Sequence, residues 1–256
     1  ATFDELVMAT TPYAYYDFQQ ASFAGGLTDV SGNARHLATL NGGPYSVAGV
    51  RSTTSYTANW GYNDPGIKSL IACRFIDTSG THCDLVMFDP TNSDRTNMTL
   101  TFSWKEEENF FGSFVKIIGW RESNGQTRFV MHTQWPSGTS QQHEFRQALN
   151  HTASLTQTST GYTTRSSDWN IFSMRYNGDI GRCSVFKNAV LIGTVDDATK
   201  NSIYAPDPAI SIFEIGGSMS SGGSGHGKMD TCVLNREALS DPQIVELHSS
   251  WMSELL

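Results

Sequence analysis

The stretch Met98-Thr99-Leu100-Thr101-Phe102-Ser103-Trp104 alternates large apolar residues with small hydroxyl residues. Successive side chains of a β-strand point to opposite faces of its sheet, so this period of two predicts a strand with one apolar face. We expect the four apolar residues of the stretch to face the core. We expect the outward positions to carry small hydroxyl and amide groups, which suits a chain in which only 16 % of the residues are charged.

Short runs of β-forming residues, separated by turn residues, continue in both directions from this stretch. The further predicted strands are Tyr13–Phe18, Ser69–Phe75, Cys83–Phe88, Ser113–Trp120, Thr127–Thr133, Trp169–Tyr176, Arg182–Lys187, Ile210–Ile215 and Lys228–Leu234. Many short strands are typical of an all-β sandwich, and 256 residues suffice for one such domain. No linker or internal repeat interrupts the pattern, so we predict a single domain over residues 1–256.

Two segments depart from the β pattern. Ser240-Asp241-Pro242-Gln243 is a capping box, and apolar residues then recur at helical spacing, which predicts a helix over residues 241–254. A shorter helix is predicted over Phe3–Ala9, with Thr2 as its N-cap. The sandwich is therefore expected to carry a short N-terminal helix and a C-terminal helix.

The formal net charge is −8, and the 17 Lys and Arg residues form no cluster. Nucleic acid is therefore disfavoured as a partner, because phosphate binding relies on concentrated positive charge. No apolar run approaches the roughly 18 residues of a membrane span, so no membrane insertion is expected. The first residues lack the pattern of a signal peptide, which favours a protein made in the cytoplasm.

The four cysteines have no zinc-ligand spacing. Cys73 and Cys83 lie symmetrically about the turn signal Asp77-Thr78-Ser79-Gly80, and two such residues facing each other in a hairpin come within disulfide reach. The alternative, which we favour, is that the cysteines are buried thiols serving as small apolar residues.

A family resemblance becomes specific when widely spaced segments are taken together. The first group of segments is Pro12–Phe18, Asp29–Arg35 and Leu37–Gly42. The second is Asp168–Asn170, Tyr176–Gly178 and Ser184–Gly193 with its turn Asn188-Ala189, and the third is Ile215–Gly217, Gly227–Asp230 and Asn235–Asp241. In this order they resemble the opening, the central hairpin and the ending of LamG-like jelly rolls, which belong to the concanavalin A-like lectins and glucanases. The resemblance implies a two-sheet antiparallel jelly-roll sandwich.

The opening segment looks especially like the LamG-like proteins encoded by tailed bacteriophages. That resemblance implies a non-enzymatic structural or adhesive virion protein, either a capsid decoration protein or a tail component. Its expected partners are other virion proteins or like subunits, and its expected location is the virion after synthesis in the host cytoplasm. The alternative is a lectin-like module that recognises surface glycans, and a polysaccharide hydrolase is a third, weaker reading.

In several relatives a structural Ca²⁺ is held by the D-x-S-G-N loop together with a late aspartate. The resemblance therefore implies a calcium site at Asp29, Asn33 and Asp230. Oxygen ligands of this kind suit Ca²⁺, and nearby backbone carbonyls can complete its shell. The alternative is that Asp29 and Asn33 only form Asx turns at the end of a strand.

Sugars stack on exposed aromatic rings, so Trp60, Tyr62 and Trp135, which lie among polar turn residues, are candidate carbohydrate-binding residues. The competing expectation is that these tryptophans are buried in the core. We predict no catalytic residues, because the E-x-D-x-x-E spacing of the glucanase relatives is absent and so are nucleophile-elbow and zinc-protease motifs. Glu106-Glu107-Glu108 is expected at a solvated hairpin tip, and His132 is expected to be an ordinary sheet residue.

Overall fold

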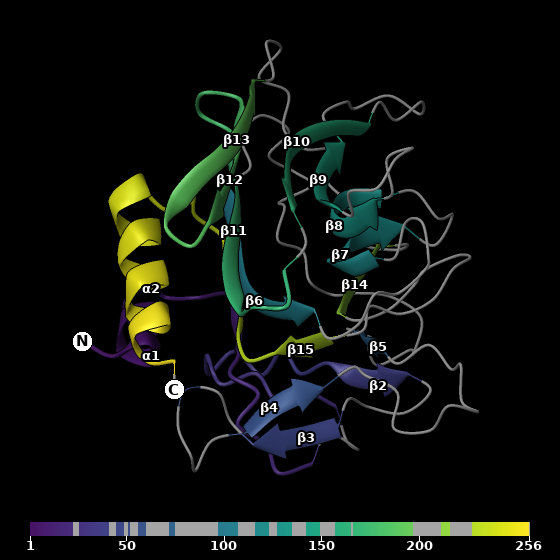
Figure 1. Ribbon diagram of the computed structural model, residues 1–256, viewed down its shortest axis with the longest axis vertical. Coiled ribbons are helices and arrows are strands. Elements are labelled where there is room, and N and C mark those ends of the chain that lie inside the picture. The colour runs from purple at the N-terminus through teal and green to yellow at the C-terminus, as the bar shows by residue number, and fades with distance from the viewer. Residues whose placement is uncertain are drawn as a thin grey trace.

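The computed structural model describes residues 1–22, 26–40, 45–48, 51, 56–59, 72–74, 97–106, 116–122, 127–134, 142–148, 157–164, 166–196, 211–215 and 227–255. Two antiparallel sheets stack face to face in this part of the chain, and two helices cover the outer side of one of them (Figure 1). The fold is therefore the all-β jelly-roll sandwich with two short helices that the sequence predicts.

The larger sheet has nine strands in the order β13-β12-β11-β6-β15-β4-β3, with β16 paired to β6 and β1 paired to β16. Its strands are β1 (Ala14–Tyr16), β3 (Tyr45–Ala48), β4 (Tyr56–Asn59), β6 (Met98–Glu106), β11 (Asn170–Asn177), β12 (Arg182–Lys187), β13 (Val190–Asp196), β15 (Gly227–Met229) and β16 (Cys232–Asn235). Strand β6, which contains the alternating stretch Met98–Trp104, pairs with β11, β15 and β16 and so lies at the centre of this sheet.

The smaller sheet has seven strands in the order β10-β9-β8-β7-β14-β5-β2. Its strands are β2 (Ala38–Leu40), β5 (Ala72–Arg74), β7 (Lys116–Glu122), β8 (Thr127–Gln134), β9 (Gln142–Ala148), β10 (Gln157–Thr164) and β14 (Ser211–Ile215). In Figure 1 this sheet lies on the side of the molecule away from the helices.

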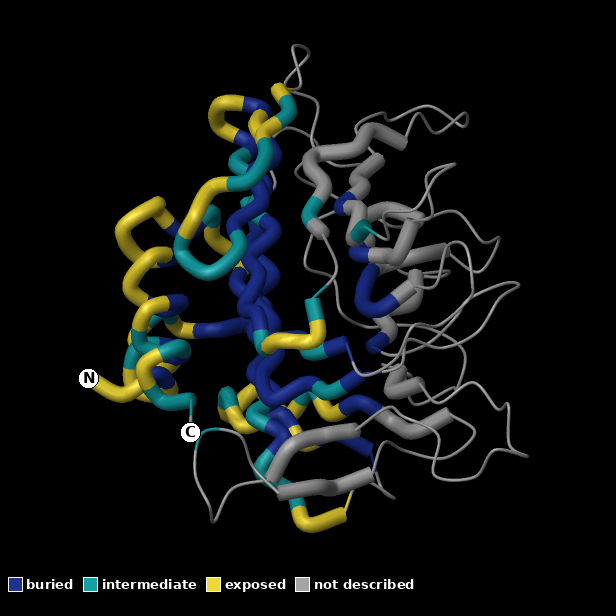
Figure 2. The backbone as a smooth tube through the Cα atoms, viewed as in Figure 1, coloured by how far each residue is buried: buried dark blue, intermediate teal, exposed yellow. Residues whose placement is uncertain are grey.

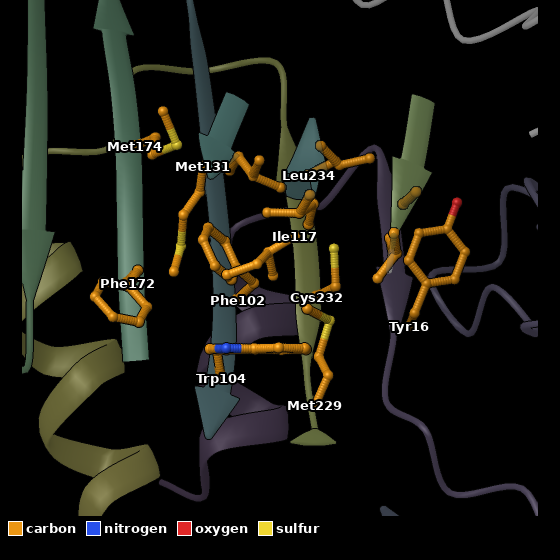
Figure 3. Packing of buried hydrophobic residues seen from close by; sticks show 14 of the residues in the cluster. Tyr16, Phe102, Trp104, Ile117, Met131, Phe172, Met174, Met229, Cys232 and Leu234 are labelled. Atoms are coloured by element: carbon orange, nitrogen blue, oxygen red, sulfur yellow. The ribbon is translucent and has the colours of Figure 1, made fainter. Parts of the chain in front are cut away.

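The main hydrophobic core fills the space between the sheets (Figure 3). The four apolar residues of β6 that were expected to face the core are all buried in it: Met98, Leu100, Phe102 and Trp104. Phe102 stacks on Phe172 of β11 at 5.6 Å between ring centroids, and Phe145 of β9 approaches Phe172 from the other sheet at 5.5 Å. The alternation in β6 therefore predicted its core face correctly.

The opposite face of β6 is not a surface, contrary to the expectation from its hydroxyl residues. Thr99, Thr101 and Ser103 are completely buried, because α1 (Phe3–Ala9) and α2 (Asp241–Ser253) cover this face. A second apolar cluster forms there, and Figure 2 shows the buried strands beneath the partly exposed helices. The cluster consists of Phe3, Val7, Tyr15, Ile171, Phe186, Val233, Leu239, Ile244, Leu247 and Trp251. The molecule thus has three layers: helices, large sheet and small sheet.

Both helices begin at the predicted caps. The hydroxyl of Thr2 accepts from the backbone N–H of Glu5, and the Ser240 hydroxyl accepts from that of Gln243; both caps are complete capping boxes. The backbone N–H of Phe3 donates to a carboxylate oxygen of Glu254 at 2.6 Å, which joins the start of α1 to the end of α2.

Other predictions need correction. The predicted strand Lys228–Leu234 is two strands, β15 and β16, because the Ser103 hydroxyl accepts the backbone N–H groups of Asp230 and Thr231 between them. Glu106 is not at a solvated tip: it is buried and accepts the indole N–H of Trp104 at 3.0 Å.

The strand register around Cys73 concerns the disulfide with Cys83 that the sequence left open. Cys73 of β5 lies between Thr39 of β2 and Ile215 of β14, so both edges of its strand are occupied by segments other than the predicted hairpin partner. Cys83, and the predicted strand Cys83–Phe88 with it, lies outside the described residues. Cys183 and Cys232 form no disulfide in the described part of the chain and are buried, as expected of thiols used as apolar residues.

Candidate functional site

Asp29, one of the three predicted calcium ligands, is buried and already saturated by backbone donors. Its carboxylate accepts the N–H groups of Tyr15 and Ser31 at 2.9 Å and that of Arg35 at 2.8 Å. Burial alone would raise the pKa of this carboxyl, but these hydrogen bonds outweigh it and hold the pKa of Asp29 below its usual value. Asp29 therefore organises the 29–35 loop as an Asx turn, which is the alternative that the sequence left open.

The other two predicted ligands also have structural partners. The Asn33 amide donates to the carbonyl oxygens of Pro12 at 3.0 Å and Tyr13 at 3.1 Å. Asp230 is fully buried and forms an ion pair with Arg51. Among the described residues there is no group of three His, Cys, Asp or Glu side chains able to hold a metal ion. The calcium site remains a prediction from the sequence resemblance.

Arg51 is the buried centre of a charged cluster that joins the helices to the large sheet. Its guanidinium contacts the carboxylates of Asp4, Asp230 and Glu254, and Asp230 also accepts the indole N–H of Trp251 at 3.2 Å. Burial opposes the charge on Arg51, but the surrounding carboxylates, Asp230 first, raise its pKa. Each member of the cluster has its partner inside the protein, so the cluster stabilises the layers and offers no open ligand position.

A serine and a histidine also meet, as they do in many hydrolases. Ser173 and His248 are hydrogen-bonded but completely buried between α2 and the large sheet. The backbone N–H of Ala189 donates to Nδ1 of His248, so Nε2 carries the proton and donates to Ser173. A general base needs a free acceptor nitrogen and access to substrate, and this histidine has neither.

The small sheet brings polar residues of four strands to neighbouring register positions. Met131 of β8 and Phe145 of β9 are cross-strand partners, and both are buried in the core. The next pair in the register of these two strands is His132 and Glu144.

The register extends this pair into a row across four strands. Lys116 of β7 is the partner of His132, and Tyr162 of β10 is the partner of Glu144. We call these four residues, Lys116, His132, Glu144 and Tyr162, the β7–β10 row. These four residues therefore occupy adjacent register positions on four neighbouring strands.

A second polar row follows two residues further along the same strands. Gln134 of β8 is the partner of Gln142 of β9, which in turn is the partner of Thr164 of β10. These three residues therefore occupy the register positions next to the β7–β10 row, two residues further along the strands.

Sequence reasoning missed the β7–β10 row for a specific reason. His132 was recognised as a sheet residue, but β9 and β10 were not predicted as strands, so its cross-strand partners were unknown. Phe145 is the one large apolar residue between Gln142 and Ala148, so this segment carries no period-of-two signal from which a strand could be predicted. The aromatic candidates Trp60, Tyr62 and Trp135 lie outside the described residues, although Trp135 directly follows the last residue of β8 in the sequence.

No protein-family model matches the sequence, and no curated protein matches it either. The described residues contain no helix with the length and apolar character needed to cross a membrane. Similarity is found at the level of the fold.

The chain is similar to domain 4 of AbnA, an extracellular arabinanase from Geobacillus stearothermophilus, whose structure contains arabinotriose. The TM-score is 0.59 at 11 % identity, over 93 % of this chain and 98 % of that domain. It is also similar to the structure from a study of botulinum neurotoxin type C and its interaction with two ganglioside molecules, with a TM-score of 0.60 and 13 % identity. The binding domain of botulinum neurotoxin serotype D matches with a TM-score of 0.62 and 10 % identity.

The match extends over nearly all of this chain in each case, but over different shares of the other chains. This chain is matched over 96 % and 94 % of its length by the type C and serotype D structures, but it spans only 52 % of each of those chains. At these identities the similarity establishes the fold alone, a jelly-roll sandwich.

Proposed function

We propose that this protein is a non-catalytic glycan-binding module that binds its ligand on the outer face of the small sheet. The observation that carries the proposal is the β7–β10 row, which aligns four groups suited to sugar recognition on adjacent strands. Neighbouring strands lie about 4.8 Å apart, so a row across four strands spans about 14 Å. An oligosaccharide lying along the row would cross one residue of the row at each strand.

The chemistry of the row suits sugar hydroxyls. A carboxylate at Glu144 accepts hydrogen bonds from hydroxyl groups, whereas Lys116 donates them, and an imidazole at His132 does both. Tyr162 adds an apolar ring with a polar hydroxyl tip, a combination common in binding sites. Hydrogen bonds to charged groups are stronger than those between neutral groups, so a few of them give a useful affinity.

The structural relatives support glycan binding as the function. The AbnA domain, which this chain matches over nearly its whole length, was solved with arabinotriose, and the type C neurotoxin study concerns gangliosides. None of the three relatives named above is described as a phage protein. The virion role therefore rests on the sequence resemblance alone, and surface glycans are the better supported partners.

A neutral oligosaccharide array that includes arabino-oligosaccharides tests the proposal, followed by calorimetric titration of the strongest ligand. We expect saturable binding that is at least tenfold weaker in the Glu144→Gln variant. Glu246→Gln is the matched control, because Glu246 lies on the exposed side of α2. The absence of any array ligand would reject the proposed function, and release of reducing sugar from a bound glycan would reject its non-catalytic part.

A further inference from the structure

The turn between β11 and β12 contains the dipeptide Asn177-Gly178, which is chemically reactive. The backbone nitrogen of Gly178 can attack Cγ of Asn177, because glycine has no Cβ to hinder the approach. The nitrogen loses its proton to a base and forms a bond to Cγ; the Cγ–Nδ2 bond breaks, and Nδ2 takes up a proton and leaves as ammonia. Water then opens the resulting succinimide to aspartate or isoaspartate. The dipeptide is therefore a potential deamidation site.

Two hydrogen bonds restrain the reacting groups in this turn. The backbone N–H of Gly178 donates to Oδ1 of Asn97 at 2.8 Å. The side-chain oxygen of Asn177 accepts the backbone N–H of Asp179 at 3.1 Å, which forms an Asx turn. Attack on Cγ requires the Gly178 nitrogen to lose the proton that it donates to Asn97. The first bond therefore opposes the reaction at the nucleophile, and the second holds the carboxamide.

Asn97 is well placed to hold this turn, because it directly precedes the central strand β6. The next residue, Met98, is the register partner of Tyr176 in β11, and both are completely buried in the main core. Gly178 is also buried, whereas Asn177 is partly exposed. The acceptor thus comes from a rigid part of the sheet, and it meets a backbone nitrogen that solvent reaches less readily than the carboxamide.

We propose that Asn177 is a latent deamidation site and that Asn97 keeps it unreactive in the folded protein. The proposal does not depend on glycan binding. Isoaspartate at position 177 would add a methylene to the backbone where β11 pairs with Arg182 of β12, so it would disturb the end of this hairpin. The hydrogen bond from Gly178 to Asn97 therefore preserves the β11–β12 turn against a slow covalent change.

The test is peptide mapping by mass spectrometry, after the whole chain has been incubated in mildly alkaline buffer with and without urea. We expect Asn177 to deamidate at least about tenfold more slowly in the folded protein than in urea, because the reaction requires the turn to open. Asn97→Ala should raise the rate in the folded protein several-fold. Asp179→Asn changes a neighbour of Asn97 but keeps the acceptor of the Gly178 N–H, so the rate should stay low.

Two controls separate local protection from general stability. The pairs Asn41-Gly42 and Asn124-Gly125 of the same chain serve as internal references, and Asn97→Ala should leave their rates unchanged. Gly227→Ala places a Cβ against Trp104, at the other end of β6, and so destabilises the protein away from the turn. This variant should raise the rate at position 177 much less than Asn97→Ala does.

Hydrogen exchange of the Gly178 amide gives a second measurement that needs no variant. We expect this amide to be protected from exchange, because it is buried and donates to Asn97. Equal deamidation rates at Asn177 in the folded protein and in urea would overturn the inference. It would also be overturned by an unchanged rate in a folded Asn97→Ala variant, by an equal increase in Gly227→Ala, or by unprotected exchange at Gly178.

Discussion

Nε2 of His248 lies 2.8 Å from Oγ of Ser173, and neither side chain is accessible to solvent. The backbone N–H of Ala189 donates to the other ring nitrogen at 2.8 Å, so the neutral imidazole is bonded at both nitrogens. The histidine thus links α2 to β11 and to the β12–β13 turn. Its role is to hold the helical layer on the sheet.

Lowering the pH should weaken this link. Burial lowers the pKa of His248 to about 3, against 6.5 for an exposed histidine. The unfolded chain therefore binds a proton below pH 6.5 that the folded protein does not, so stability is full above pH 6.5 and declines as the pH falls toward 3. Between pH 6.5 and pH 5 this one group should remove about 2 kcal/mol from the free energy of unfolding.

Urea unfolding at pH 7 and pH 5 measures this effect. The variant His248→Asn, whose amide oxygen replaces Nδ1 as acceptor, should lose clearly less stability over this range than the unchanged protein. Equal losses in the two proteins would show that His248 is not responsible.

Gly227 should not tolerate a side chain. A Cβ at this position would overlap the carbonyl oxygen of Lys105 and the indole ring of Trp104, both part of rigid β6. Gly227→Ala should therefore lower the free energy of unfolding by about 1–3 kcal/mol through overpacking. The comparison is Gly32→Ala, where the space is open and only the positive φ of 89° is strained. Thermal unfolding should show the larger loss at position 227; the reverse order would contradict the packing of Trp104.

The β12–β13 turn contains an alanine where a glycine is preferred. Asn188 and Ala189 both have positive φ, 48° and 67°, which is the backbone of a type I′ turn. Ala189→Gly removes the steric strain and keeps the N–H that bonds to His248. After the entropy cost of glycine, a gain of up to about 1 kcal/mol is expected. A lower melting temperature in this variant would show that the turn is not strained.

The contributions of Arg51 and Asp230 to the free energy of unfolding should depend on each other. Arg51→Met leaves the buried Asp230 carboxylate without its cation, which should cost about 3–5 kcal/mol. Adding Asp230→Asn removes the stranded charge and keeps an acceptor for Trp251, so the double variant should recover much of the loss. Denaturant midpoints of the single and double variants decide this, and simple addition of the two losses would contradict the coupling.

Local patterns predicted much of the fold. The alternation in β6 identified its core face, and the capping boxes at Thr2 and Ser240 located both helices, because these signals depend on residues close in sequence. The burial of Thr101 on the other face of β6 could not be predicted in this way. It depends on α2, which is more than a hundred residues away along the chain.

The candidate sites show the same contrast between features set by neighbouring residues and features set by long-range contacts. Asp29 and Asn33 were identified from their loop, yet their structural effect, fixing Arg35 beside Tyr13, depends on long-range hydrogen bonds. The β7–β10 row depends on register between strands, which single-strand patterns do not specify. Sequence reasoning therefore identified the fold, whereas the polar face proposed for binding needed the paired strands.

The central claim is that a glycan lies on the outer face of the small sheet. Titration of the strongest array ligand into ¹⁵N-labelled protein, followed by amide chemical shifts, tests it most directly. We predict that the largest shifts fall on β8, β9 and β10, around His132, Glu144 and Tyr162. Saturable binding whose shifts leave these strands unchanged would contradict the account.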